Sequence, residues 1–219
     1  MSNTANKTQE QQTYKNDEPV SCKVIIVGDS GVGKTTIIGR YLNKYNPYEK
    51  NTIGASFSSR REIIDNYQII FDIWDTAGQE RFHSVNKIFY NEAYICLLVY
   101  DITNNESFVS LKNYWYNTVK ENSLDGIIFA VAGNKIDMAE NEKVNQKEVK
   151  EFCEKINAEH KLTSAKQNTA IDDLFILIGK RFLDSKFFKN IDAKLKKKEE
   201  EKKKKKLLAE SKAKKKGWC

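Results

Sequence analysis

The segment from Gly28 to Thr35 has the residue types and the spacing needed to hold phosphate groups. It reads GDSGVGKT, so that Gly28 is followed by four residues and then by Gly33, Lys34 and Thr35. This is the G-x-x-x-x-G-K-[ST] pattern, in which glycines let successive backbone N–H groups point at an anion. A helix that follows adds its positive N-terminal end. Lys34 is spaced to reach the β- and γ-phosphate oxygens, and the Thr35 hydroxyl to bind Mg²⁺.

Two later segments have the chemistry to recognise a guanine base. Asn134, Lys135 and Asp137 follow an N-K-x-D spacing. The carboxylate of Asp137 can accept from the N1–H and the 2-amino group of guanine, a pair of donors that adenine lacks. The Asn134 amide can meet N7, and the Lys135 stem can cover the ring. In the segment TSAK, the Ala165 N–H is available for the guanine O6. Together with the phosphate loop, these segments predict a guanine nucleotide.

Apolar runs of strand length position these motifs. The runs are Cys22 to Val27, Phe57 to Ile64, Tyr67 to Trp74, Ile95 to Tyr100 and Ile127 to Val131. Most are separated by segments of helical periodicity, which predicts an α/β protein with a largely parallel sheet. Asp65 and Asn66 form a hairpin signal, so the second and third runs are expected to be antiparallel. Ligands of such sheets bind beyond the carboxyl ends of the strands, where all these motifs fall.

Length and charge divide the chain of 219 residues into one domain with extensions. Residues 189–219 hold 14 Lys and 5 acidic residues, whereas residues 1–188 carry a net charge of −2. A nearly neutral body argues against a nucleic acid partner. Residues 1–19 are polar and lack a secretory signal, so we predict a disordered N-terminal extension, a nucleotide-binding domain over 20–188 and a Lys-rich tail over 189–219.

Further patterns bear on the location of the chain. No apolar run approaches the roughly 20 residues that span a bilayer, so we expect a cytoplasmic protein. Cys22, Cys96 and Cys153 lie singly in apolar contexts, which favours buried reduced thiols. In the tail, Glu199 to Glu201 precede Lys203 to Lys205 by four residues, a pairing that favours an extended helix.

The order and spacing of the motifs over about residues 20–185 resemble the Ras superfamily of small GTPases, and most closely the Rab family. The segment IWDTAGQERF, residues 73–82, is the most specific, and YDITNNESF, residues 100–108, resembles the segment after the fourth Rab strand. NTIGASF together with QERFHSV is similar to endosomal Rabs. The resemblance implies a P-loop NTPase fold with a six-stranded, mostly parallel sheet, one antiparallel edge strand and helices on both faces.

The resemblance also implies a GTP-binding and GTP-hydrolysing switch that regulates vesicle trafficking by recruiting effectors in the GTP state. Asp75 would hold Mg²⁺ through water, the Gly78 N–H would contact the γ-phosphate, and Gln79 would orient the attacking water. Thr52 would reach Mg²⁺ only when the γ-phosphate is present. The implied nucleotide set is Ser30, Gly31, Val32, Gly33, Lys34, Thr35, Thr36, Thr52, Gly78, Asn134, Lys135, Asp137, Ser164, Ala165 and Lys166, and the metal set is Thr35, Thr52 and Asp75.

Partners follow from the same resemblance. Phe57, Trp74 and Phe89 fall where Rabs place an aromatic triad that effectors read, although they could instead only pack on the sheet edge. An exchange factor, a GTPase-activating protein (GAP), effectors and a GDI-type carrier are expected. Cys219 ends a Lys-rich tail and resembles the prenylated cysteine of Rabs, which usually carry two; the alternative is a free thiol. With the lipid, the chain would lie on the cytosolic face of an endomembrane such as the endosome.

Two other functions stay open at this point. One is a hydrolysis-deficient GTP-binding scaffold, against which the presence of Gln79, Thr52 and Asp75 speaks. The other is a small-molecule kinase with a phosphate loop, which would need an acceptor site and lid arginines. Arginine is scarce after Arg81.

Overall fold

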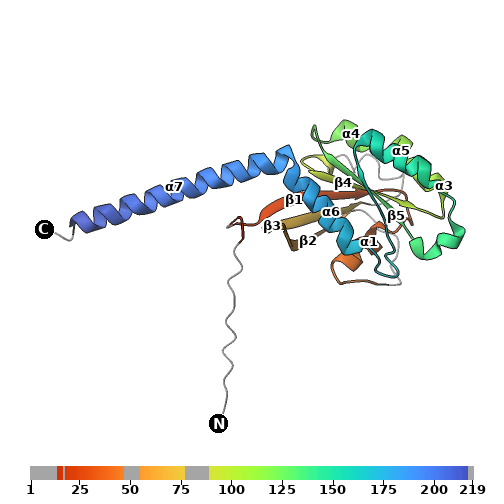
Figure 1. Cartoon of the computed structure of the whole chain (residues 1–219), viewed down its shortest axis with the longest axis horizontal. Helices are drawn as coiled ribbons and strands as arrows, with labels where there is room; N and C mark the ends of the chain where they lie inside the picture. The colour runs from red at the N-terminus through yellow and green to blue at the C-terminus, as the bar shows by residue number, and fades with distance from the viewer. Residues whose placement is uncertain (1–13, 17, 47–54, 77–88, 217–219) are drawn as a thin grey trace, which may run out of the picture.

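A six-stranded sheet forms the centre of the computed structural model, which describes residues 14–16, 18–46, 55–76 and 89–216 (Figure 1). The strands are β1 (Val20–Val27), β2 (Ala55–Ile64), β3 (Tyr67–Thr76), β4 (Ile95–Asp101), β5 (Ile128–Asn134) and β6 (Glu159–Leu162). Their spatial order is β2-β3-β1-β4-β5-β6. All neighbouring pairs are parallel except β2 and β3. The predicted fold class is therefore confirmed.

The antiparallel edge is produced by the predicted hairpin. Ile64 pairs with Tyr67, which leaves Asp65 and Asn66 as a two-residue turn. Both turn residues have positive φ, at 49° and 67°. Such a turn matches the right-handed twist of the two strands it joins.

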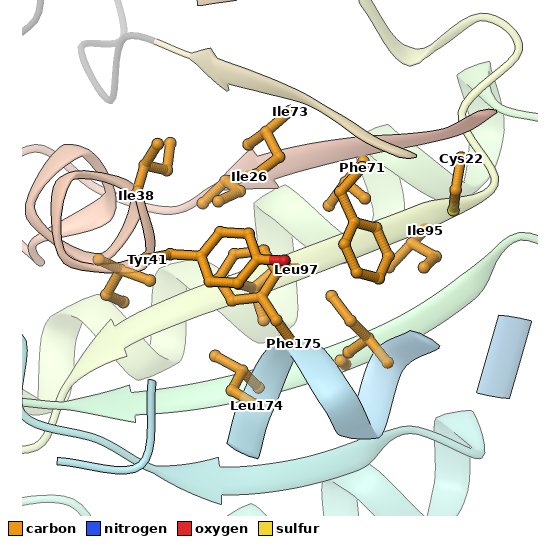
Figure 2. Close-up of a cluster of buried hydrophobic side chains, with 14 of the residues drawn as sticks. Cys22, Ile26, Ile38, Tyr41, Phe71, Ile73, Ile95, Leu97, Leu174 and Phe175 are labelled. Carbon is orange, nitrogen blue, oxygen red and sulfur yellow. The ribbon is translucent and has the colours of Figure 1, made fainter. Parts of the chain in front are cut away.

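Helices cover both faces of the sheet, each over its own apolar core. The helical elements are α1 (Lys34–Tyr41), α3 (Asn105–Ser110), the π-helix η2 (Leu111–Trp115), α4 (Tyr116–Asn122), the 3₁₀ helix η3 (Ile136–Asn141), α5 (Gln146–Ile156), α6 (Ile171–Asp184) and α7 (Lys186–Lys216). One core lies under α1, α6 and the start of α7, and the other under α3 to α5. Figure 2 shows the first core, in which the Tyr41 ring stacks on the Phe175 ring.

Helix α7 begins inside the domain and then leaves it (Figure 1). Phe188 is buried in the first core, and the partly buried Phe187, Ile191 and Leu195 pack against that core. The expected extended helix in the tail is present, and the boundary predicted after residue 188 falls within it. The domain therefore makes contacts beyond that boundary.

Part of the predicted N-terminal extension also contacts the domain. Asn16 is buried, and its Oδ1 accepts from the Gln68 backbone N–H at 2.8 Å, while its Nδ2 donates to the Gln68 carbonyl at 3.0 Å. This pairing imitates a strand contact at the start of β3. Residues 1–13 lie outside the described residues.

The three predicted buried thiols are confirmed. Cys22, Cys96 and Cys153 are free and buried. Burial raises the pKa of all three, that of Cys153 to about 12. They are therefore protonated and unreactive near neutral pH.

Candidate nucleotide site

The phosphate loop joins β1 to α1 and contains two glycines at which any side chain would collide with a neighbouring segment. A Cβ on Gly28 would lie 2.2 Å from the Val99 carbonyl oxygen, and one on Gly33 would lie 2.3 Å from the Asn134 amide nitrogen. Gly33 also has φ of 99°, in the region that favours glycine. Helix α1 starts immediately after it, at Lys34. The loop is therefore packed tightly against β4 and β5 and leads into a helix N-terminus.

Lys34 brings a positive charge into this loop. It is 5% exposed, and its Nζ donates to the carbonyls of Gly28 at 2.8 Å and Asp29 at 2.9 Å. Burial lowers its pKa from 10.5 to about 8, against the opposing effect of Asp75 and Asp29. The side chain is thus a buried cation at neutral pH, which suits it to bind an anion.

The predicted metal ligands Thr35 and Asp75 lie together beside Lys34. The Thr35 hydroxyl donates to the Asp75 Oδ2 at 2.6 Å, and Asp75 is almost fully buried. The neighbouring Thr76 hydroxyl donates to the Ile26 carbonyl at 2.7 Å and so holds the end of β3 against β1. A hydroxyl and one carboxylate are hard oxygen donors and fit Mg²⁺, which takes few protein ligands alongside phosphate oxygens. The described residues contain no cluster of three or more His, Cys, Asp or Glu that could hold a metal.

Asn134 connects the phosphate loop to the predicted base-binding segments. It is 2% exposed, and its Nδ2 donates to the Val32 carbonyl at 2.9 Å. Its Oδ1 accepts from the Ala165 N–H at 3.1 Å and the Thr163 hydroxyl at 3.3 Å. One side chain therefore ties together three segments that are far apart in the sequence. The sequence predicted a contact of Asn134 with the base but not this connecting role.

The other base-binding residues are held from several elements. Lys135 Nζ pairs with the Asp101 carboxylate at 2.6 Å. Burial by itself would raise the pKa of Asp101, but hydrogen bonds from Lys135 and Thr103 lower it overall. The Ser164 hydroxyl donates to Asp137 Oδ1 at 2.5 Å. Sequence reasoning missed the role of Asp101, although its segment YDIT was noted as part of the family resemblance.

The TSAK loop is also held from helix α1. Arg40 Nε donates to the Ala165 carbonyl at 2.6 Å, and the Arg40 guanidinium lies over the Tyr45 ring. No pattern in the sequence predicted this contact. A residue of the helix behind the phosphate loop therefore supports the loop that carries the predicted guanine contact.

The remaining predicted residues divide into two groups. Ser30 and Gly31 are exposed at the loop mouth, Val32 is buried, Thr36 lies in the first turn of α1, and Lys166 is exposed next to Ala165. Thr52, Gly78, Gln79 and Cys219 lie outside the described residues. The roles of these four residues stay predictions.

The three predicted effector residues form a continuous row of rings, with Phe57 on β2, Trp74 on β3 and Phe89 in the helical turn before β4. Phe57 and Trp74 are paired across β2 and β3, with ring centroids 5.2 Å apart, and Trp74 lies 5.4 Å from Phe89. Phe57 is 54% exposed. Beside it lies an open pocket of about 610 Å³, also lined by Tyr94 and Leu124. The row both packs on the sheet edge and presents an aromatic surface to solvent.

Within the described part of the chain, no helix has the length and apolar character needed to cross a membrane.

Comparisons with known proteins agree with this architecture. The Ras family model matches residues 23–184. Rab-21 from Geodia cydonium is 38% identical over 167 residues, covering 76% of this chain and 72% of that protein. Human Rab-21 is 39% identical over 75% of this chain and 73% of its own length. Rab7 from Neurospora crassa is 41% identical over 75% of this chain and 83% of its own length. These relatives carry Rab names, in agreement with the predicted Rab family. The chain therefore belongs to the Ras family and is a Rab-type small GTPase within it.

Proposed function

We propose that this chain binds GTP and Mg²⁺, hydrolyses the GTP slowly, and recruits effectors to a membrane while GTP is bound. The observation that carries the proposal is the contact network of Asn134, which joins the phosphate loop to the NKID and TSAK segments. A phosphate site and a guanine site that share one rigid side chain suit a single guanine nucleotide. The family membership supports the same activity.

Each end of the nucleotide has its own set of residues in this proposal. Lys34 and the N–H groups of the loop neutralise the β- and γ-phosphates. Thr35 and Asp75 hold Mg²⁺, which would offset charge on the phosphate oxygens during transfer. Asp137 accepts from the base, and its orientation is maintained by the Ser164 hydroxyl. Gln79 positions the attacking water. In this proposal the residues of the chain mainly orient the reactants and stabilise charge.

The switch and its readout follow from the same site. Thr52 and Gly78 contact Mg²⁺ and the γ-phosphate only in the GTP state, and hydrolysis releases the segments that carry them. Phe57, Trp74 and Phe89 flank these segments in the sequence, contact one another through their rings, and would anchor the effector. An exchange factor replaces GDP by GTP and so turns the switch on. A GAP accelerates GTP hydrolysis and so turns it off.

Membrane attachment requires two signals in this proposal. Cys219 carries one geranylgeranyl thioether, which by itself binds a bilayer only marginally. The lysines of the tail add attraction to anionic lipids, about 1 kcal/mol each near the surface. A GDI-type carrier extracts the GDP form. The chain would then lie on the cytosolic face of an endomembrane, with the endosome favoured by the Rab-21 similarity.

Nucleotide competition and single-turnover hydrolysis test the enzymatic part. We expect strong preference for GTP over ATP, and intrinsic hydrolysis on the order of 10⁻⁴ to 10⁻³ per second that a cell extract accelerates. Equal affinity for ATP would refute the guanine site. No hydrolysis even with extract would favour a GTP-binding scaffold, and phosphate transfer to a small acceptor would favour a kinase.

Intact mass and fractionation test the anchor. The membrane-bound wild type should carry the added mass of one prenyl group, and Cys219→Ser should become soluble while keeping GTP hydrolysis. The matched control Cys153→Ser changes a buried thiol of the domain and should fractionate as wild type. An unmodified mass would exclude the lipid and leave the GTPase proposal intact.

A further inference from the structure

The carboxylate of Asp29, the second residue of the phosphate loop, is held by the helical segment α3–η2. This segment covers the face of the sheet opposite to α1. Its Oδ1 accepts from the Ser110 hydroxyl at 2.7 Å and from the Trp115 indole N–H at 2.7 Å. Ser110 ends α3 and Trp115 ends η2. Two donors from one helical segment therefore converge on a single oxygen of the loop.

The π-helical turn accounts for this convergence. In an α-helix, residues five positions apart point about 140° away from each other. In η2, however, the Tyr116 N–H donates to the Leu111 carbonyl, an i→i+5 bond that widens the turn. The wider turn rotates Trp115 toward the side of Ser110. Single π turns of this kind often occur at functional sites.

Trp115 is the fixed end of the contact. Its side chain is 1% exposed and belongs to the core beneath α3 to α5, where Tyr114 meets it edge-on at 5.1 Å. Asp29 lies in the loop rather than in the core. It follows Gly28, whose φ of 147° is open to few residues other than glycine. The hydrogen bonds therefore fix the position of the loop relative to the core.

The backbone of Asp29 transmits this position to the phosphate site. Its carbonyl oxygen accepts from Lys34 Nζ at 2.9 Å, so that Asp29 lies between the helix and the buried ammonium. A carboxylate in an anion-binding loop would also repel phosphates. The two donors, Ser110 and Trp115, partly offset this negative charge.

We propose that Asp29 is a positioning residue for the nucleotide, held in place by Ser110 and Trp115 through the π turn. The proposal rests on the nucleotide function proposed above and adds a dependence on α3 and η2. Release of this contact lets the loop relax and speeds nucleotide dissociation. The helical segment that carries Ser110 and Trp115 thereby influences how tightly the nucleotide is bound.

The test measures how fast a fluorescent GDP analogue dissociates from the full chain in excess GTP. Trp115→Phe keeps an aromatic ring, smaller than the indole, but removes the N–H, and Asp29→Ala removes the acceptor. Each should accelerate dissociation about 10-fold, since hydrogen bonds to charged groups are the strong ones. Ser110→Ala, a milder change, should accelerate it about 3-fold. The double variant Asp29→Ala/Trp115→Phe should be no faster than the faster single variant, because both remove the same contact.

Two controls separate positioning from general loss of stability. Asn113→Ala changes an exposed residue of the same π turn and should dissociate as wild type. Asp29→Asn keeps an acceptor oxygen and should lie between wild type and Asp29→Ala. In a Trp74→Phe/Trp218→Phe background, Asp29→Ala should also shift the emission of Trp115.

Specific outcomes would overturn the inference. Dissociation from both Trp115→Phe and Asp29→Ala within 2-fold of wild type would refute it, as would single effects that multiply in the double variant. A wild type that binds no guanine nucleotide would instead refute the proposed function, and the inference with it. The two failures are therefore distinguishable from the wild-type measurement alone.

Discussion

Phe188→Ala tests whether the first turns of α7 belong to the GTPase domain. Phe188 is 5% exposed, and its ring packs at 5.0 Å from Tyr67 and 5.7 Å from Phe182. These partners belong to the hairpin edge and to α6, so that removal of the ring leaves a void between three elements. We expect the variant to fold, but with lower stability.

The size of the loss follows from the burial. Removal of a buried Phe side chain costs roughly 3–5 kcal/mol, through lost transfer energy and the remaining cavity. Phe188 lies at the edge of the core, where neighbours can partly refill the space, so we expect about 3 kcal/mol. With a urea m-value of about 2 kcal/mol/M, the unfolding midpoint would fall by about 1.5 M.

Urea unfolding at fixed, saturating GDP and Mg²⁺ measures this change, since bound ligand alters apparent stability. Leu207→Ala is the matched control, because Leu207 lies on the same helix at 66% exposure. It should change stability by less than about 0.5 kcal/mol. A loss below about 1 kcal/mol for Phe188→Ala would refute the view that α7 is built into the core.

Other predictions concern the site and its pH dependence. Asp137→Asn exchanges an acceptor for a donor and should shift preference from guanine to xanthine nucleotides; unchanged selectivity in competition would contradict the base assignment. Gln79→Leu should slow GAP-stimulated hydrolysis at least about 10-fold and retain GTP, as single-turnover assays would report. Thr35→Asn should weaken Mg²⁺ binding and favour GDP, seen as lost GTP affinity at equal Mg²⁺. Burial lowers the pKa of His160 below 6.5, so the folded state binds fewer protons than the unfolded chain. Folding stability should therefore decline as pH falls below about 6.5, until the lowered pKa is passed; a His160→Gln variant with the same decline would refute this.

The local sequence determined the features whose partners lie close by in the chain. The loop GDSGVGKT and the turn of Asp65 and Asn66 are short patterns with narrow backbone requirements, and the structure has the predicted β2–β3 hairpin. The long apolar runs likewise predicted the central strands, because burial on both faces needs continuous apolar residues. Strand β6 was not located in advance, since Glu159–Leu162 is short, polar and only half-buried.

Tertiary packing decided the contacts that hold the candidate site together. Asn134 meets Val32 across 102 residues, and Trp115 meets Asp29 across 86. No local sequence pattern predicts such pairs. The π turn that orients Trp115 toward Asp29 has no sequence signature of its own. The same holds for Phe188, which lies at the edge of a lysine-rich segment yet is buried. Propensity and spacing act over a few residues, whereas a hydrogen bond between distant segments exists only once the sheet and its helices have brought them within about 3 Å.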